Sequence, residues 1–378
     1  MSHVSSHSPH GQSPLRTVQV LGGASAGSSA HVRSLAAGLV ARGVRVTVCA
    51  PAEADLAYGF TGVGAHHVPV PRSSDPAAVS ALRAACADAD LVHAHGIHAA
   101  LRAVLALSGR SVPLIVTWHT RSQADGARAH LLRLLERRVA RAAAVVLGTS
   151  SDLVDRARRR GARDARLAAV AFPAPRPPAE PLDLDPSRHK ARAELGATEG
   201  PLLIAVGSLD RHRGYHTLLD ASRAWCRLDP VPLLVVAGEG PLRPVLQRRI
   251  EDEELPVRLI GKREDVTELL AAADLVVLPS KWESRSLLAQ EALHARVPLV
   301  ATAVGGIPET VGDAAELVPY GNAKALADAV VRLLADPERR EVLREKGARQ
   351  AATWPTEDET VAQVLSVYDE FTRFRPLV

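Results

Sequence analysis

Short apolar runs alternate with amphipathic stretches along almost the whole chain. In the first half the apolar runs are rich in β-branched residues, which is typical of buried strands. The expected strands cover residues 17–22, 44–50, 66–70, 91–95, 114–118 and 144–148. Between the first two, five apolar residues fall at helical spacing: Val32, Leu35, Ala36, Leu39 and Val40. The predicted helix takes Ser28 or Ser29 as its N-cap and ends at Gly43. This half therefore predicts a doubly wound parallel sheet.

A second series of apolar runs follows a proline-rich stretch. Residues 173–186 hold six prolines and show no periodicity, which indicates an interdomain linker. Beyond it, the expected strands cover residues 202–207, 232–238, 257–261, 274–279 and 298–302. The predicted fold class is therefore α/β, with two Rossmann-like doubly wound parallel-sheet domains facing across a cleft. The predicted parts are a disordered tail (1–15), a first domain (16–172), the linker (173–186), a second domain (187–355) and a C-terminal helix crossing back to the first domain (356–378).

The composition is that of an ordinary soluble protein. Hydrophobic residues make up 47% and charged residues 23% of the 378 residues. No apolar run approaches the roughly 18 residues that a membrane-spanning helix needs. Cys49, Cys86 and Cys226 are too few and too far apart for a disulfide framework or a CxxC site. The Ser-, His- and Pro-rich start lacks the pattern of a secretion signal, so we expect a cytoplasmic protein.

The net charge of +4 hides an asymmetry between the two halves. Residues 1–172 carry +10, and residues 173–378 carry −6. Arginines concentrate in residues 128–141 and 156–166. Solvated helix faces explain such clusters, and the alternative is peripheral contact with an anionic membrane at its inner face, or with an acidic acceptor. Nucleic acid is not expected as a partner, because no aromatic residues interleave with these arginines.

Candidate chemistry lies in the loops after the strands, because ligands of open parallel sheets bind at the carboxyl ends of the strands. The loop GGASAGSSAHV, residues 22–32, is built of small residues that let backbone N–H groups approach a phosphate, although a plain tight turn is the alternative. The loop GSLDRHRG, residues 207–214, places Arg211 and Arg213 between glycines. Guanidinium groups in such a loop suit a diphosphate.

A third segment, residues 279–311, has the most specific pattern. Glu283 falls in a loop after a strand, Ser286 begins a predicted helix, and Glu291 lies about two turns along that helix. A helix N-terminus between two acids predicts a site for an anion and for sugar hydroxyls. Two solvated surface glutamates are the alternative interpretation.

This third segment resembles the ExxxxxxxE signature of retaining glycosyltransferase family 4, the glycosyl transferases group 1. Further motifs follow in the order and spacing of that family over nearly the whole chain: HAHG (93–96), TWHT (117–120), GTSS (148–151), GSLDRHRG (207–214), GEGP (238–241) and IGKREDV (260–266). The resemblance implies the GT-B fold and a hexosyltransferase that moves a sugar from a UDP- or GDP-sugar to a hydroxyl acceptor with retention. The acceptor would be a small molecule, a lipid or a glycan, and no cofactor is required beyond the nucleotide sugar as co-substrate.

The resemblance also implies roles for particular residues. Glu283 would lie near the donor sugar, His119 would contact it, and Arg213 takes the place of the usual lysine beside the diphosphate. The residues expected to bind the rest of the donor are Gly27, Ser28, Gly207, Ser208, Arg211, Gly261, Lys262, Ser286, Leu287, Leu288 and Glu291. The acceptor is expected near His95 and His98.

Two positions depart from the family pattern. Ser208 stands where an arginine is common, and Arg285 is bulky and charged where small or apolar residues are usual. Two alternative functions therefore stay open: a GT-B-type epimerase or hydrolase of nucleotide sugars, and a noncatalytic nucleotide-sugar-binding scaffold.

No metal site is expected. Asp88 and Asp90 match a DxD motif in letters, but they come just before a strand, at the end of the sheet opposite the expected site. His93, His95 and His98 have the spacing of a metal cluster, although contact with the acceptor is the favoured interpretation.

Overall fold

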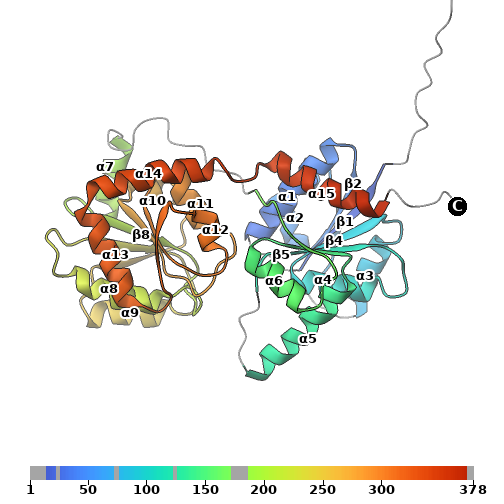
Figure 1. The fold of residues 1–378 in the computed structure, drawn as a ribbon, viewed down its shortest axis with the longest axis horizontal. Helices are drawn as coiled ribbons and strands as arrows, with labels where there is room; N and C mark the ends of the chain where they lie inside the picture. Colours follow the sequence, from blue (N-terminus) through green and yellow to red (C-terminus); the bar gives the residue numbers. More distant parts are fainter. Residues whose placement is uncertain (1–13, 23–25, 72–75, 122–125, 172–185, 373–378) are drawn as a thin grey trace, which may run out of the picture. The chain divides into compact units, whose positions relative to one another are not determined.

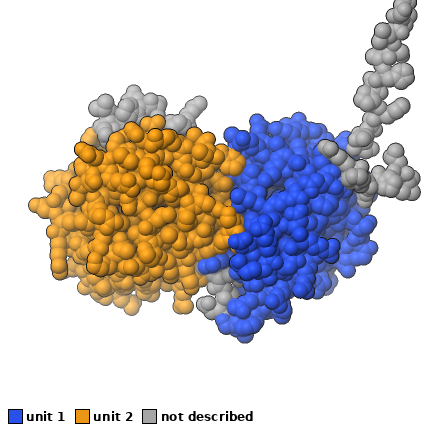
Figure 2. All heavy atoms as spheres, viewed as in Figure 1, with its two compact units in different colours: residues 1–148, 154–170, 356–378 blue, residues 149–153, 171–355 orange. Residues whose placement is uncertain are grey.

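The computed structural model describes residues 14–22, 26–71, 76–121, 126–171 and 186–372. The chain folds as two compact units (Figure 2): residues 1–148, 154–170 and 356–378 form unit 1, and residues 149–153 and 171–355 form unit 2. Each unit is a parallel sheet flanked by helices (Figure 1). The predicted class of two Rossmann-like α/β domains is therefore confirmed. Most of the predicted linker lies outside the described residues.

The sheet of unit 1 has seven parallel strands in the order β3-β2-β1-β4-β5-β6-β7. The strands are β1 Arg16–Leu21, β2 Arg45–Ala50, β3 His66–Pro69, β4 Leu91–His95, β5 Leu114–Trp118, β6 Val145–Gly148 and β7 Ala165–Leu167. The order reverses between the neighbours β1 and β4, whose register sets Gln19 beside His93 and Leu21 beside His95. Such a reversal is where ligands of doubly wound sheets bind.

The helices of unit 1 cover both faces of this sheet. They are α1 Ala26–Ala41, α2 Ala52–Tyr58, α3 Pro76–Ala85, α4 Ile97–Ala106, α5 Gly126–Ala142, α6 Ser151–Arg159 and α15 Glu357–Thr372, with a 3₁₀ turn at Thr61–Val63. The predicted apolar stripe of α1 is inward, since Val32, Leu35 and Leu39 are buried. The predicted N-cap was wrong, because α1 begins at Ala26 and includes Ser28 and Ser29 in its first turn.

Unit 2 repeats this design with a six-stranded parallel sheet in the order β10-β9-β8-β11-β12-β13. The strands are β8 Leu202–Val206, β9 Leu233–Ala237, β10 Val257–Gly261, β11 Leu275–Leu278, β12 Leu299–Thr302 and β13 Ala315–Val318. The helices are α7 Pro186–Leu195, α8 Tyr215–Trp225, α9 Arg243–Asp252, α10 Val266–Ala272, α11 Leu287–His294, α12 Ile307–Val311, α13 Ala323–Ala335 and α14 Pro337–Ala351. Two buried apolar clusters lie on the two faces of the sheet.

The last helix, α15, packs against unit 1 far from its place in the sequence. Gly38 of α1 lies so close to Val361 that a side chain there would collide with the valine. The Gln363 side chain accepts from the Ala169 N–H at 2.6 Å and donates to the Leu167 carbonyl at 2.9 Å. These contacts place the buried Tyr368 beneath the β1–β4 reversal, where its hydroxyl reaches Gln19 and His93.

The expected strands agree with the observed ones to within about a residue at each end, and residues 91–95, 114–118 and 257–261 match in full. The edge strands β7 and β13 were not predicted. Their sequences, ARL and AELV, are short and carry polar residues, so they lack the apolar run of a central strand. Within the described residues, no helix combines the length and apolarity that crossing a bilayer demands.

Candidate active site

Two loops meet at the strand-order reversal of unit 2. The loop after β8 carries Arg213, and the loop after its neighbour β11 carries Glu283. The Arg213 guanidinium forms an ion pair with the Glu283 carboxylate. The Ser280 hydroxyl donates a second hydrogen bond, of 2.8 Å, to the same carboxylate oxygen. Two of the three residues predicted as catalytic are thus in direct contact.

Glycines allow the backbone of these loops to approach so closely. Gly214 has φ +72°, and a Cβ there would collide with the Pro279 carbonyl at the end of β11. Gly305 has φ +53°, and a Cβ there would collide with the Glu283 carbonyl. The following N–H, of Gly306, donates to that carbonyl at 2.9 Å. The Gly–Gly pair after β12 therefore packs directly against the backbone of the Glu283 loop and supports it.

The helix after this loop, α11, begins where the sequence predicted. Ser286 is its N-cap, with extended backbone and a hydroxyl that accepts from the Ala289 N–H. Leu288 is buried, whereas Leu287 is 42% exposed. Glu291 lies further along, and burial raises the pKa of its carboxyl. The free N–H groups of the first turn of α11 give this end of unit 2 a positive potential beside the Arg213–Glu283 pair.

The other predicted donor-binding residues of unit 2 line neighbouring loops. The Gly207 carbonyl accepts from the Tyr215 hydroxyl at 3.0 Å, and the Ser208 hydroxyl donates to Asp210 at 2.6 Å. Gly261 ends β10 with φ +78°. Arg211 and Lys262 are exposed, and Lys262 lies 3.6 Å from Glu264 rather than beside the Arg213–Glu283 pair.

Arg285, the unusual residue of the Glu283 loop, is largely enclosed. Its Nε and Nη2 atoms are inaccessible to solvent and have no hydrogen-bond partner within the described part of the chain. Burial lowers the pKa of this guanidinium, and the charge of Glu309 opposes that effect. The residue that departs most from the family pattern is thus a partly buried guanidinium in unit 2.

Unit 1 builds a different site at its own strand-order reversal. His95 ends β4, His119 follows β5 and His31 projects from α1, and one ring nitrogen of each lies within 4.8 Å of the others. His119 Nε2 and His95 Nδ1 are 3.5 Å apart. Burial lowers the pKa of His31 to about 4 and holds the pKa values of His95 and His119 well below the usual 6.5. All three imidazoles are therefore neutral at physiological pH.

The other unit 1 predictions divide around this cluster. Gly27 and Ser28 lie in the first turn of α1, the helix that also carries His31. His98 is exposed on α4 and is not one of the three clustered histidines. The two residues predicted near the acceptor thus differ in burial, since His95 is buried at the end of β4 and His98 is exposed.

The structure also changes the candidate metal ligands. Among the described residues, His31, His95 and His119 are the set with metal-ligating geometry, rather than the His93, His95 and His98 pattern of the sequence. His31 was missed because it lies far earlier in the chain, and only the small-residue loop before it hinted at a site. The DxD carboxylate of Asp90 accepts from the Arg16 N–H at 2.8 Å, at the start of β1 and away from both sites.

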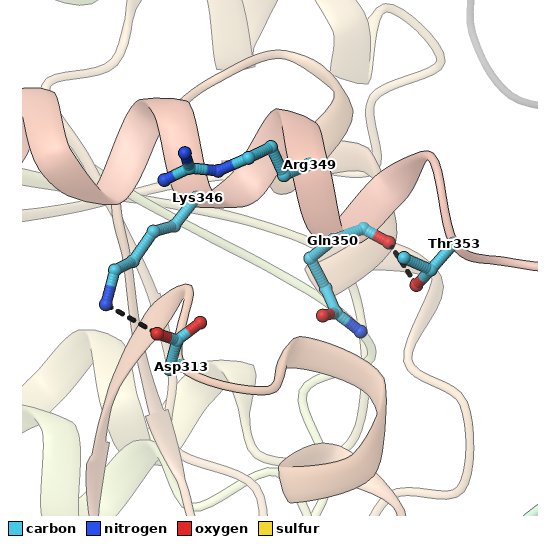
Figure 3. Close-up of a pocket in the computed structure, with 5 residues that line it drawn as sticks. All are labelled: Asp313, Lys346, Arg349, Gln350 and Thr353. Atoms are coloured by element: carbon cyan, nitrogen blue, oxygen red, sulfur yellow. Dashed lines mark hydrogen bonds and ion pairs between the residues drawn. The ribbon is translucent and has the colours of Figure 1, made fainter.

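Two hollows lie outside these sites. In unit 2, a hollow of about 270 Å³ is lined by Asp313, Lys346, Arg349, Gln350 and Thr353 (Figure 3). Lys346 pairs with Asp313 at 2.5 Å, and none of the predicted site residues lines this hollow. In unit 1, a hollow of about 610 Å³ is lined by Val104, Leu134, Arg137, Arg138, Arg141 and Ala142. The second hollow is basic and runs along α5.

Two doubly wound units, each with a site at its strand-order reversal, define the GT-B architecture. The sequence profile of the glycosyl transferase 4-like domain matches residues 26–173, and that of the glycosyl transferases group 1 matches residues 187–350. The chain belongs to this glycosyltransferase family.

Named relatives and solved structures agree with this assignment. The chain is 31% identical over 315 residues to a D-inositol 3-phosphate glycosyltransferase of Xylanimonas cellulosilytica, covering 76% of this chain and 73% of that protein. It is 32% identical over 231 residues to the alpha-D-kanosaminyltransferase of Streptomyces kanamyceticus, covering 58% of each, so it spans a little over half of that relative. The fold is similar to that of Anabaena HepE in complex with UDP and glucose, with a TM-score of 0.77, 19% identity, and coverage of 93% of this chain and 98% of that one.

Proposed function

We propose that this chain is a retaining hexosyltransferase that moves a sugar from a UDP- or GDP-sugar to a hydroxyl group of an acceptor, without a metal ion. The observation that carries the proposal is the contact between Arg213 and Glu283 beside the N-terminus of α11. A cation, a carboxylate and a helix N-terminus at one strand-order reversal suit a substrate with both a diphosphate and a sugar. HepE, with its similar fold, was solved with UDP and glucose.

The proposed reaction uses fixed positive potential where charge develops. The bond between the sugar C1 and the diphosphate oxygen breaks, and the acceptor oxygen bonds to C1 on the same face. Arg213 and the first N–H groups of α11 stabilise the leaving diphosphate, and a phosphate oxygen takes the acceptor proton. Glu283 stabilises the positive sugar and positions it, while its own charge is balanced by Arg213 until the diphosphate arrives.

A binding screen tests the donor half of this proposal. Thermal unfolding of the full chain is measured with UDP, GDP, ADP, CDP and dTDP, and then with the sugar conjugates of any base that binds. A ligand at 100 times its Kd adds about 2.7 kcal/mol to stability, which raises the Tm by several degrees. A shift with UDP or GDP supports the proposal. No shift with any nucleotide contradicts it, and would mean that Arg285 and Ser208 have removed the donor site.

Product analysis tests the reaction. The anomeric configuration of the product, compared with that of the donor, establishes or refutes retention, and full activity in EDTA is expected if no metal takes part. Sugar release or a changed sugar without any acceptor would favour the epimerase or hydrolase alternative. Nucleotide binding without turnover under any of these conditions would favour the noncatalytic scaffold, for which the two enclosed, unpartnered nitrogen atoms of Arg285 among the described residues are the specific observation.

The acceptor is proposed to be a small molecule, a lipid or a glycan, reached by unit 1. The Xylanimonas relative is named for inositol 3-phosphate, an acceptor with an anionic group. Unit 1 offers the basic hollow along α5, with Arg137, Arg138 and Arg141 among its lining. The same helix exposes Leu131 and Leu134, at 57% and 59%. Arginines beside exposed leucines also support the proposal of peripheral contact with an anionic membrane.

A further inference from the structure

A continuous set of hydrogen bonds joins the C-terminal helix to the histidine cluster of unit 1. The Tyr368 hydroxyl lies 3.0 Å from Gln19 Nε2 and 2.8 Å from His93 Nδ1. Gln19 Oε1 lies 3.0 Å from His95 Nε2, and His95 Nδ1 lies 3.5 Å from His119 Nε2. All five side chains except that of His119 are buried, so solvent does not replace any of the inner bonds.

The chemistry of each group gives this set of bonds a direction. The amide nitrogen of Gln19 faces two hydroxyl oxygens, those of Tyr368 and of Thr17 at 3.4 Å, so it donates to both. Its carbonyl oxygen then faces His95 and can only accept, which puts the His95 proton on Nε2. Because a neutral imidazole carries one proton, His95 Nδ1 is an acceptor, and His119 Nε2 must carry the proton between them.

The remaining bonds are consistent with the same direction. Since the Tyr368 oxygen accepts from Gln19, its own proton is directed to His93 Nδ1. His93 therefore carries its proton on Nε2, which lies 2.7 Å from the Thr117 hydroxyl oxygen. Every polar atom of the set except His119 Nδ1 thus has a partner, and no proton is duplicated or missing.

We propose that Tyr368 and Gln19 are positioning residues that act through His95 to fix the proton of His119 on Nε2. His119 then presents Nδ1 as a hydrogen-bond acceptor. If the proposed glycosyl transfer holds, on which this second step rests, and His119 contacts the donor sugar as the family resemblance implies, then the group that it contacts is a hydroxyl that donates, and the C-terminal helix is part of the active enzyme.

Histidine tautomers measured by ¹⁵N NMR of the full, ¹⁵N-histidine-labelled chain test the first step without any activity assay. The expected result is a proton on Nε2 of both His95 and His119. In Tyr368→Phe, Gln19 loses an acceptor and its amide is free to turn, so the His95 proton is expected to shift toward Nδ1. A wild-type His95 protonated on Nδ1, or tautomers that Tyr368→Phe leaves unchanged, would overturn the proposal. Gln19→Met serves as a second variant if Tyr368→Phe does not fold.

Kinetics test the second step, with a control on the same helix. Tyr368→Phe is expected to lower kcat/KM for the donor about tenfold, the effect of about one hydrogen bond, with the KM of the acceptor unchanged. Gln363→Met removes two bonds that dock α15 but touches no histidine, so it should leave both the tautomers and kcat/KM unchanged. Equal losses in both variants would mean that α15 acts only by docking. A wild-type chain with the expected tautomers but no transferase activity would refute the proposed function and leave the proton assignment intact.

Discussion

The two units share one topology yet build opposite kinds of site at the same place in the fold. In unit 2, the strand-order reversal brings together a full positive and a full negative charge, Arg213 and Glu283. In unit 1, it gathers neutral imidazoles joined through Gln19 and Tyr368. The fold therefore fixes where a site forms, and the side chains after the strands decide its electrostatics.

The charge at each site differs from the net charge of the half of the chain that contains it. The first half of the chain is strongly basic, yet burial depresses the pKa values of its site histidines and keeps them uncharged. The second half is acidic, yet its site presents a guanidinium and a helix N-terminus. Net charge thus describes the outer surfaces, where most arginines of α5 and α6 are exposed, and says little about the sites.

The largest expected effect is a loss of transfer rate when the charged site of unit 2 is disrupted. Glu283→Gln keeps the shape of the side chain but removes the charge that balances Arg213 and would stabilise the positive sugar. We expect the transfer rate to fall at least about a hundredfold while nucleotide binding is retained or strengthened. Steady-state turnover and nucleotide-induced Tm shifts measure the two quantities.

A matched control separates this effect from loss of an ion pair. Glu316 pairs with Arg339 at 2.8 Å in the same unit. Glu316→Gln should cost little stability and leave turnover unchanged. Full activity of Glu283→Gln would remove Glu283 from the mechanism.

The charged site could be predicted from sequence better than the neutral one. Glu283, Ser286 and Arg213 lie in loops directly after strands, where short-range pattern and the carboxyl-end rule suffice. His31, Gln19 and Tyr368 could not be found in that way. Gln19 is a polar residue between two valines of a buried strand, and Tyr368 is an ordinary inward position of an amphipathic helix. Their meeting depends on the packing of α15 against β4, which joins segments from opposite ends of the chain.

The second-largest expected effect is a loss of stability at low pH, caused by the buried neutral histidines of unit 1. Below the unfolded pKa of about 6.5, the unfolded chain takes up protons on these histidines. The folded chain does not do so until about pH 4 for His31 and about pH 3 for His93, because burial lowers their pKa values. Each such histidine should therefore remove about 1.4 kcal/mol of stability per pH unit as the pH falls from about 6 toward 4.

Urea unfolding between pH 7.5 and 4.5 measures this slope. His93→Gln should flatten it, because one buried neutral histidine is gone. The exposed His98 and His130, each changed to Gln, provide control variants outside the buried network. A wild-type stability that does not vary over this range would show that the cluster accepts protons in the folded state, and the contrast between the two sites would then fail.

The smallest expected effect is on binding to anionic vesicles, and it tests whether the surface arginines of α5 act separately from the sites. Within α5, the single acid, Glu136, is buried and paired with Arg156 and Arg160. All the charged side chains on the exposed face of the helix are therefore cationic. If this face contacts anionic lipid, Arg137→Gln should weaken binding to phosphatidylserine vesicles by about 1 kcal/mol, which is roughly fivefold in affinity. Co-sedimentation measures the binding, and the difference between wild type and variant should shrink at high salt.

The exposed Arg248 of unit 2 offers a control, because its change to Gln should not alter vesicle binding. Turnover on an uncharged, water-soluble acceptor should be equal in both variants, because such an acceptor carries no anionic group for Arg137 to bind. Equal vesicle binding by wild type and Arg137→Gln would remove the membrane from the partners of unit 1 and leave its arginines as solvating groups.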